Sequence, residues 1–112
     1  MNDLLENAKE FIESGEDNIK KERYNVSVAD FFKAIAVLCD YLIYKNIKTL
    51  PKNHLDRFNL LKAYFPEIYS VVSPMFRRYT ESYNQRMTKQ DAIKFENYAH
   101  ELRNFVSSKE KV

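Results

Sequence analysis

Apolar residues recur at intervals of three and four along most of this chain, the spacing that gathers side chains on one face of an α-helix. The first stripe predicts a helix over about residues 3–22. The second is the strongest and predicts a central helix over about residues 27–46, which Asn25 or Ser27 is expected to cap. The apolar positions are Leu4, Ala8, Phe11, Ile12, Gly15 and Ile19 in the first stripe, and Val28, Phe31, Phe32, Ile35, Leu38, Cys39, Leu42 and Ile43 in the second.

Two further helices are predicted after the loop around Pro51. Asn53 is a suitable N-cap for a short third helix that ends near residue 65, with Asp56 in its first turn. Pro66 suits the first turn of a fourth helix. Pro74 lies inside this fourth pattern and removes one backbone hydrogen bond, which predicts a kink or a split near Ser73. The predicted buried face of the fourth helix consists of Ile68, Val71, Val72, Met75, Phe76 and Tyr79.

A fifth helix is predicted to start after Thr88. Thr88 and Asp91 have the spacing of a capping box, with Asp in place of the usual Glu. Its predicted inward positions are Ala92, Phe95, Ala99, Leu102 and Val106.

Five helices joined by short loops predict an all-α fold, an antiparallel up-and-down bundle with the short third helix packed across the others and the fourth kinked at Pro74. With 112 residues, the chain (1–112) has the length of a single domain. It contains one Gly and three Pro, which leaves little turn material for an all-β fold.

Composition favours a cytoplasmic protein. The single cysteine, Cys39, rules out an internal disulfide framework and indicates a reducing compartment. Cys39 lies in an apolar stripe and is predicted to be an inert core residue. No signal peptide is expected, because residues 1–20 carry acidic residues throughout, and no segment approaches the roughly 18 apolar residues that would span a membrane.

Charge is unevenly distributed along the chain. Residues 1–22 hold seven acidic residues against three lysines, a formal charge of −4, which leaves +6 for the rest of a chain whose net charge is +2. A basic region of this size could favour a polyanionic partner, and a mixed solvated surface explains it equally well.

The most distinctive segment contains two guanidinium groups and two phenols within seven residues. Arg77 and Arg78 could hold phosphate through forked hydrogen bonds, and Tyr83 could stack on a base. Arg86 could extend the basic rim. The structural alternatives are surface ion pairs, for example with Glu81, a Tyr83 ring buried against a neighbouring helix, and an isolated surface cation at Arg86.

Several familiar sites are not expected. One Gly cannot build a glycine-rich phosphate loop. His54 and His100 lie far apart in sequence and neither completes a Glu-x-x-His motif, so we expect no metal site and no cofactor. His54 is expected to serve local packing or capping.

Three segments, taken in order, resemble the HEPN family of small helical proteins. The resemblance covers about residues 4–106 and rests on their order and spacing. The segments are Arg23 and Tyr24 before the small–aromatic–aromatic–x–Ala pattern of residues 27–34, residues 51–54 followed by Phe58, and Arg78 with Tyr83 before the last helix.

This resemblance implies a helical bundle that pairs as a homodimer. Some HEPN proteins are RNA-cleaving toxins, and others accompany a small nucleotidyltransferase as its antitoxin target or substrate-binding partner. The ribonucleases of the family use an Arg followed four to six residues later by His, and the paired motifs of two subunits line one cleft. Here the fifth residue after Arg78 is Tyr83, which departs from that pattern.

This departure argues against efficient catalysis. Cleavage of RNA through the 2′-hydroxyl needs a group that takes a proton near pH 7, whereas a Tyr of ordinary pKa is ionised in only about one molecule in a thousand at that pH. The leading hypothesis is therefore a nucleotide-binding or RNA-binding module, the partner of a small nucleotidyltransferase, with its site at Arg77, Arg78, Tyr83 and Arg86. The alternatives are a metal-independent ribonuclease homodimer that uses Arg78 and Tyr83, and a structural adaptor without a ligand.

Overall fold

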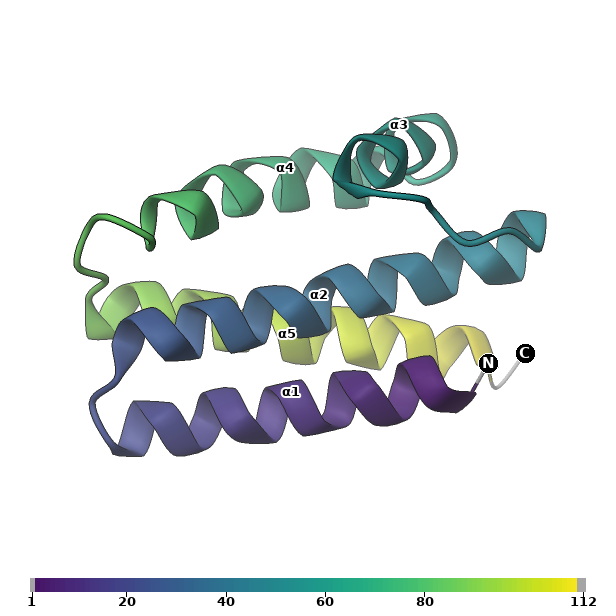
Figure 1. Cartoon of the computed structure of the whole chain (residues 1–112). Coiled ribbons are helices and arrows are strands. Elements are labelled where there is room, and N and C mark those ends of the chain that lie inside the picture. The colour runs from purple at the N-terminus through teal and green to yellow at the C-terminus, as the bar shows by residue number, and fades with distance from the viewer. Residues whose placement is uncertain (1, 111–112) are drawn as a thin grey trace.

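The computed structural model describes residues 2–110 and contains five helices within them (Figure 1). They are α1 (Asn2–Lys20), α2 (Tyr24–Ile47), α3 (His54–Tyr64), α4 (Pro66–Glu81) and α5 (Lys89–Glu110). The predicted all-α fold is confirmed, and no strand occurs in the described part of the chain.

Four of the helices run lengthwise in alternating directions, and α3 crosses at one end, where Figure 1 shows it end-on. The start of α1 and the end of α5 lie at that same end of the bundle, whereas the α4–α5 loop lies at the other (Figure 1). The central element is α2, which packs against each of the other four helices. The loop after α4 is thus far from α3 but close to the start of α2.

The core confirms the predicted stripes of α2 and α5. All eight apolar positions predicted for the second helix are buried, Cys39 among them, and so are the five predicted inward positions of the last helix. The face of α4 is less deeply buried than predicted. Only Val72 and Met75 are fully buried in this helix, and Val71 is 40% exposed.

Gly15 lets α1 and α2 approach closely. A Cβ atom added at this position would lie 2.6 Å from the buried ring of Phe31. The Ser27 hydroxyl donates a hydrogen bond of 2.8 Å to the Gly15 carbonyl at the same crossing. The only glycine in the sequence therefore stands where a side chain would separate the two helices.

The predicted cap of α2 was wrong. The helix begins at Tyr24, with Arg23 at the N-cap and no side-chain capping bond. Asn25 and Ser27 both lie inside the helix, because their polar groups serve tertiary contacts. Ser27 bonds to α1, and Asn25 bonds to the loop after α4.

The other two predicted caps are confirmed. The Asn53 side chain accepts a hydrogen bond of 2.9 Å from the Asp56 backbone N–H at the start of α3. At the start of α5, the Thr88 N–H donates to the Asp91 carboxylate at 2.8 Å, and the Asp91 N–H donates to the Thr88 hydroxyl at 3.1 Å. These reciprocal bonds form the expected capping box.

Pro74 does not split the fourth helix. The helix continues from Pro66 to Glu81, and its ribbon is unbroken in Figure 1. Pro74 has no N–H for the Ser70 carbonyl, which lies on the exposed side of the helix, where water can satisfy it. None of the described helices combines the length and the apolar character needed to cross a membrane.

Candidate functional site

The end of α4 and the loop 82–88 carry the predicted site residues, and Asn25 of α2 fixes this segment. The Asn25 amide donates to the carbonyls of Ser82 and Gln85 at 2.8 and 2.7 Å, and its side-chain oxygen accepts from the Met87 N–H at 2.9 Å. Met87 itself is buried. One side chain of α2 thus holds the loop at its beginning, middle and end.

Arg78 is already engaged within the protein. Its Nε and Nη2 atoms donate to the two carboxylate oxygens of Asp91 at 3.3 and 2.9 Å. Its Nη1 atom donates to Glu81 at 3.2 Å and to Gln85 at 3.4 Å. These hydrogen bonds, to Asp91 first and to Glu81 next, raise the pKa of Arg78 above its ordinary value. The guanidinium group therefore ties the end of α4 to the start of α5.

Tyr83 is strongly exposed, with 76% of its surface accessible. Its ring meets that of Tyr79 edge to face at a centroid distance of 5.7 Å, and the two hydroxyls are 3.0 Å apart. Tyr79 in turn stacks on the buried ring of Phe32 at 4.9 Å. The expected core role of Tyr79 is thus partly realised, and its outer edge supports an exposed phenol.

Arg77 and Arg86 are both exposed, one on α4 and one in the loop. Within residues 2–110, neither forms an ion pair with a carboxylate within 4.0 Å. The four predicted residues therefore do not converge on one point. Arg78 turns toward α5, whereas Tyr83 turns toward Tyr79, and the two remaining arginines stay available to a partner.

A second polar group at the α3 end was missed by the sequence analysis. Arg57 of α3 donates to both oxygens of Asp40 on α2, at 2.7 and 2.9 Å. Its Nη1 atom lies 2.7 Å from Nδ1 of His54. Burial lowers the pKa of His54, and the charge of Arg57 lowers it further. His54 also packs on Phe76 at 4.8 Å, which agrees with its expected packing role.

A row of aromatic rings connects these two regions along one side of α4. Phe58 meets Phe76 at 5.0 Å, and Phe76 meets Tyr79 at 6.2 Å. The row ends in the exposed Tyr83 ring. The sequence analysis placed Phe76 and Tyr79 on the buried face of the fourth helix, and it did not predict that their rings would continue to Tyr83 in the loop.

The Tyr79 phenol at the end of α4 is suited to hydrogen bonding rather than to proton transfer. Burial and the hydrogen bond with Tyr83 raise the pKa of Tyr79 to about 12, so this phenol stays protonated at neutral pH. Protonated phenols donate hydrogen bonds and offer π-faces to bases. One exposed guanidinium group can bind two phosphate oxygens through parallel hydrogen bonds.

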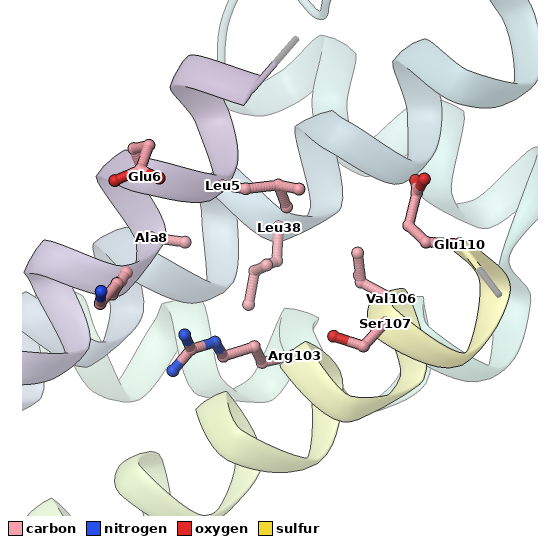
Figure 2. Close-up of a pocket in the computed structure, with 9 residues that line it drawn as sticks. Leu5, Glu6, Ala8, Leu38, Arg103, Val106, Ser107 and Glu110 are labelled. Atoms are coloured by element: carbon pink, nitrogen blue, oxygen red, sulfur yellow. The ribbon is translucent and has the colours of Figure 1, made fainter.

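Other hollows lie away from Tyr83, and one of them is lined in part by Arg78. Figure 2 shows one of about 400 Å³ between α1 and α5, floored by Leu38 of α2, with Arg103 extending from α5 toward α1. Its rim carries charges of both signs, from Glu6, Lys9, Arg103 and Glu110. Among the described residues, no buried side-chain nitrogen or oxygen lacks a hydrogen-bond partner.

A shallow apolar groove runs between α4 and α5. Three adjoining hollows of about 420, 280 and 230 Å³ share Val71 in their walls. Val71, Ile93 and Phe105 are 40%, 36% and 39% exposed there. The groove arises because α5 packs mainly on α2 and α1. Part of the predicted buried face of α4 therefore stays exposed.

One group of potential metal ligands spans α1 and α5. Glu16, Glu96 and His100 each offer a ligand atom, and these atoms lie within 4.8 Å of one another. Nε2 of His100 lies 2.9 Å from a carboxylate oxygen of Glu16. The sequence analysis expected no metal site because neither histidine follows a Glu by three residues. Glu96 and His100 are four residues apart, and this spacing also places them on the same helix face.

Comparison of this chain with protein-family models, with curated proteins and with solved structures gives no match. The geometry therefore defines an all-α bundle with an exposed arginine–tyrosine end, and the likeness to HEPN proteins stays a resemblance.

Proposed function

We propose that this protein is a HEPN-like module that binds RNA or a nucleotide at the end of α4 and does not cleave it efficiently. The observation that carries this proposal is the exposed Tyr83 ring, braced edge-on by Tyr79, with an exposed arginine on either side of it in the sequence, Arg77 and Arg86. Any of the four bases can stack on such a ring, so this contact does not depend on the RNA sequence. The guanidinium groups of Arg77 and Arg86 attract the adjoining phosphates.

The arrangement assigns different roles to the two neighbouring arginines. Arg77 is available to a ligand, whereas Arg78 would have to give up bonds to Asp91 and Glu81 before it could clamp a phosphate. We therefore assign Arg78 to positioning the loop, with direct phosphate contact coming mainly from Arg77 and Arg86. This revises the equal weight that the sequence analysis gave to the pair.

The ribonuclease alternative has less support. Tyr79 holds its proton far above neutral pH, and His54 is engaged by Arg57 next to α2. A general base for the 2′-hydroxyl would have to come from Tyr83, whose phenol pairs with Tyr79. The homodimer and the nucleotidyltransferase partner rest on the family resemblance alone.

Fluorescence anisotropy with a labelled single-stranded RNA and with a labelled ATP analogue tests the proposal. Base stacking on an aromatic side chain is worth about 1–3 kcal/mol, so Tyr83→Ala should weaken binding by about 5- to 150-fold. Arg77→Ala and Arg86→Ala should each reduce the slope of log binding constant against log salt concentration by about 0.7, the value for one phosphate contact on single-stranded RNA. The matched controls are Tyr64→Ala, an exposed tyrosine of α3, and Lys52→Ala, an exposed cation before α3.

Unchanged affinities in Tyr83→Ala and in the arginine variants would reject the proposal. Incubation of the protein with RNA in the absence of metal addresses cleavage directly. Products that vanish in Tyr83→Phe and in Arg78→Ala would favour the ribonuclease instead. Sedimentation of the free protein reports whether it pairs as the resemblance implies.

The apolar groove between α4 and α5 favours one second candidate, a structural adaptor that receives a partner protein. Its exposed Val71, Ile93 and Phe105 offer the kind of surface that helices pack on. Phe105→Ser with Ile93→Ser would then abolish partner capture while leaving RNA affinity intact. The two candidates are thus separated by which set of substitutions removes binding.

A further inference from the structure

The contact between α1 and α5 contains a mixed group of one imidazole and two carboxylates. Glu96 and His100 stand one turn apart on α5, and Glu16 reaches them from α1. All three side chains are partly exposed, with 36% of Glu16 and 42% of His100 accessible. They are therefore open to solvent ions and have room to adjust their rotamers.

Negative charge is crowded at this point. Partial burial raises the pKa of Glu96, and a hydrogen bond shared with Glu16 and the negative charge of Glu16 raise it further. Nε2 of His100 lies 2.9 Å from a carboxylate oxygen of Glu16. Two carboxylates and an imidazole offer oxygen and nitrogen lone pairs at one point, so a metal cation placed among them would be bound by all three groups together.

We propose that Glu16, Glu96 and His100 bind a divalent first-row transition-metal ion, Zn²⁺ best among those commonly available, and that the ion clasps α1 to α5. One imidazole nitrogen favours such a metal over Mg²⁺ or Ca²⁺, which prefer oxygen ligands alone. Two carboxylate oxygens complete three protein ligands, and water fills the fourth position of a tetrahedral zinc site.

The geometry requires only side-chain movement. Zinc binds nitrogen and oxygen ligands at about 2.0–2.2 Å, so that two ligands of a tetrahedral ion lie about 3.4 Å apart. The potential ligand atoms lie within 4.8 Å of one another, and Nε2 of His100 is 2.9 Å from a Glu16 oxygen. Adjusting these separations by up to about 1.4 Å needs a change in the rotamers of partly exposed glutamates rather than a helix movement.

The rest of the chain offers little competition for the ion. Cys39 is fully buried in the core, and His54, the other histidine in the sequence, contacts Arg57. A single binding event per chain is therefore expected to report on this site.

Isothermal titration calorimetry of the tag-free protein with ZnCl₂ at pH 7.5 is the first test. We expect one ion per chain and a dissociation constant on the order of 1–100 μM, as befits three partly exposed ligands. Zinc at a hundredfold excess over that constant should raise Tm by roughly 5–10 °C, because the ion binds the folded chain preferentially. The same concentration of MgCl₂ should leave Tm unchanged.

Variants connect the binding to these residues. His100→Ala and Glu16→Gln should each weaken zinc binding at least tenfold and remove the rise in Tm. The matched controls are Glu101→Gln, an exposed glutamate next to His100, and His54→Ala, which should bind zinc as the wild type does. Circular dichroism in the absence of metal shows whether each variant is folded. If His100→Ala does not fold, Glu16→Gln still tests the site.

The inference is overturned if the wild type shows no saturable binding below 1 mM zinc. It is equally overturned if His100→Ala and Glu16→Gln bind zinc as tightly as the wild type, or if His54→Ala is the variant that loses binding. RNA affinity does not enter any of these readouts, so the metal site and the proposed function fail or stand separately.

Discussion

Arg78 of α4 and Asp91 of α5 form a two-pronged ion pair across the loop that joins the helices, with N–O distances of 3.3 and 2.9 Å. The same Asp91 carboxylate accepts from the N–H and the hydroxyl of Thr88 at 2.8 and 3.1 Å. One carboxylate therefore caps α5 and holds the end of α4. It also binds the guanidinium group of Arg78, which the sequence analysis had proposed as a phosphate ligand.

This arrangement makes the protein sensitive to acid through Asp91. Partial burial by itself would raise the pKa of Asp91, but hydrogen bonds from Arg78 and Thr88 together outweigh it, so the pKa lies below its ordinary value of 3.8. A depressed folded-state pKa stabilises the fold above the unfolded-state value, and this contribution is lost as the pH falls through the folded-state value. Asp91→Asn should therefore lower stability at pH 7, with the difference shrinking below about pH 3.8.

Urea unfolding of wild type and Asp91→Asn between pH 2.5 and pH 7 measures this difference. Asp17→Asn, an exposed carboxylate of α1, serves as the control and should follow the wild-type curve. A gap between wild type and Asp91→Asn that stays constant across the whole pH range would show that the charge of Asp91 does not contribute.

The amide of Asn25 should be essential to the loop that carries Tyr83. Asn25→Ala leaves two carbonyls and one N–H without their partner, and an unsatisfied polar group costs about 1–3 kcal/mol where water cannot replace the bond. We expect a loss of about 1–3 kcal/mol in the free energy of unfolding, measured with urea. Asn25→Asp should be no better, because it places a carboxylate against the same two carbonyls. Asn46→Ala, an exposed position of the same helix, should change stability by less than about 0.5 kcal/mol.

Gly15→Ala should destabilise the bundle, although alanine is the better helix former by about 1 kcal/mol. The new Cβ would stand 2.6 Å from the Phe31 ring, which is completely buried. Overpacking of this kind costs about 1–3 kcal/mol, which exceeds the gain in propensity. The expected net loss is up to about 2 kcal/mol by urea unfolding.

A second substitution tests the cause of that loss. Phe31→Leu makes room at the crossing, so Gly15→Ala should cost less in the Phe31→Leu background than in the wild type. Additive effects of the two substitutions would contradict the contact as the cause.

The thiol of Cys39 should react only when the protein opens. Burial, and then the nearby charge of Asp40, raise the pKa of this thiol to about 12, and none of its surface is exposed. Ellman's reagent should label a negligible fraction of native protein within minutes and one thiol per chain in urea. The labelling rate should rise along the unfolding transition seen by circular dichroism. Rapid labelling without denaturant would place Cys39 outside the core.

The sequence by itself determined the helices and most of the core. The stripes of α2 and α5, the Asn53 cap and the box of Thr88 and Asp91 depend on residues a few positions apart, which local periodicity and hydrogen bonding fix. The same spacing correctly gave a buried Cys39. The error at Asn25 has a definite cause, since this residue type caps helices locally but here found partners about 60 residues away.

Only the tertiary structure decided which polar groups meet. Arg77 and Arg78 are neighbours in sequence, yet successive positions of a helix point about 100° apart, so Arg78 turned to Asp91 while Arg77 stayed exposed. Tyr83 lies beyond the helix end, in the loop, and its hydroxyl meets that of Tyr79. Glu16 and His100 are 84 residues apart and come together because α1 and α5 pack side by side. Local patterns fix which face of each helix is buried, but the identity of the groups that face one another follows from how the helices are placed together.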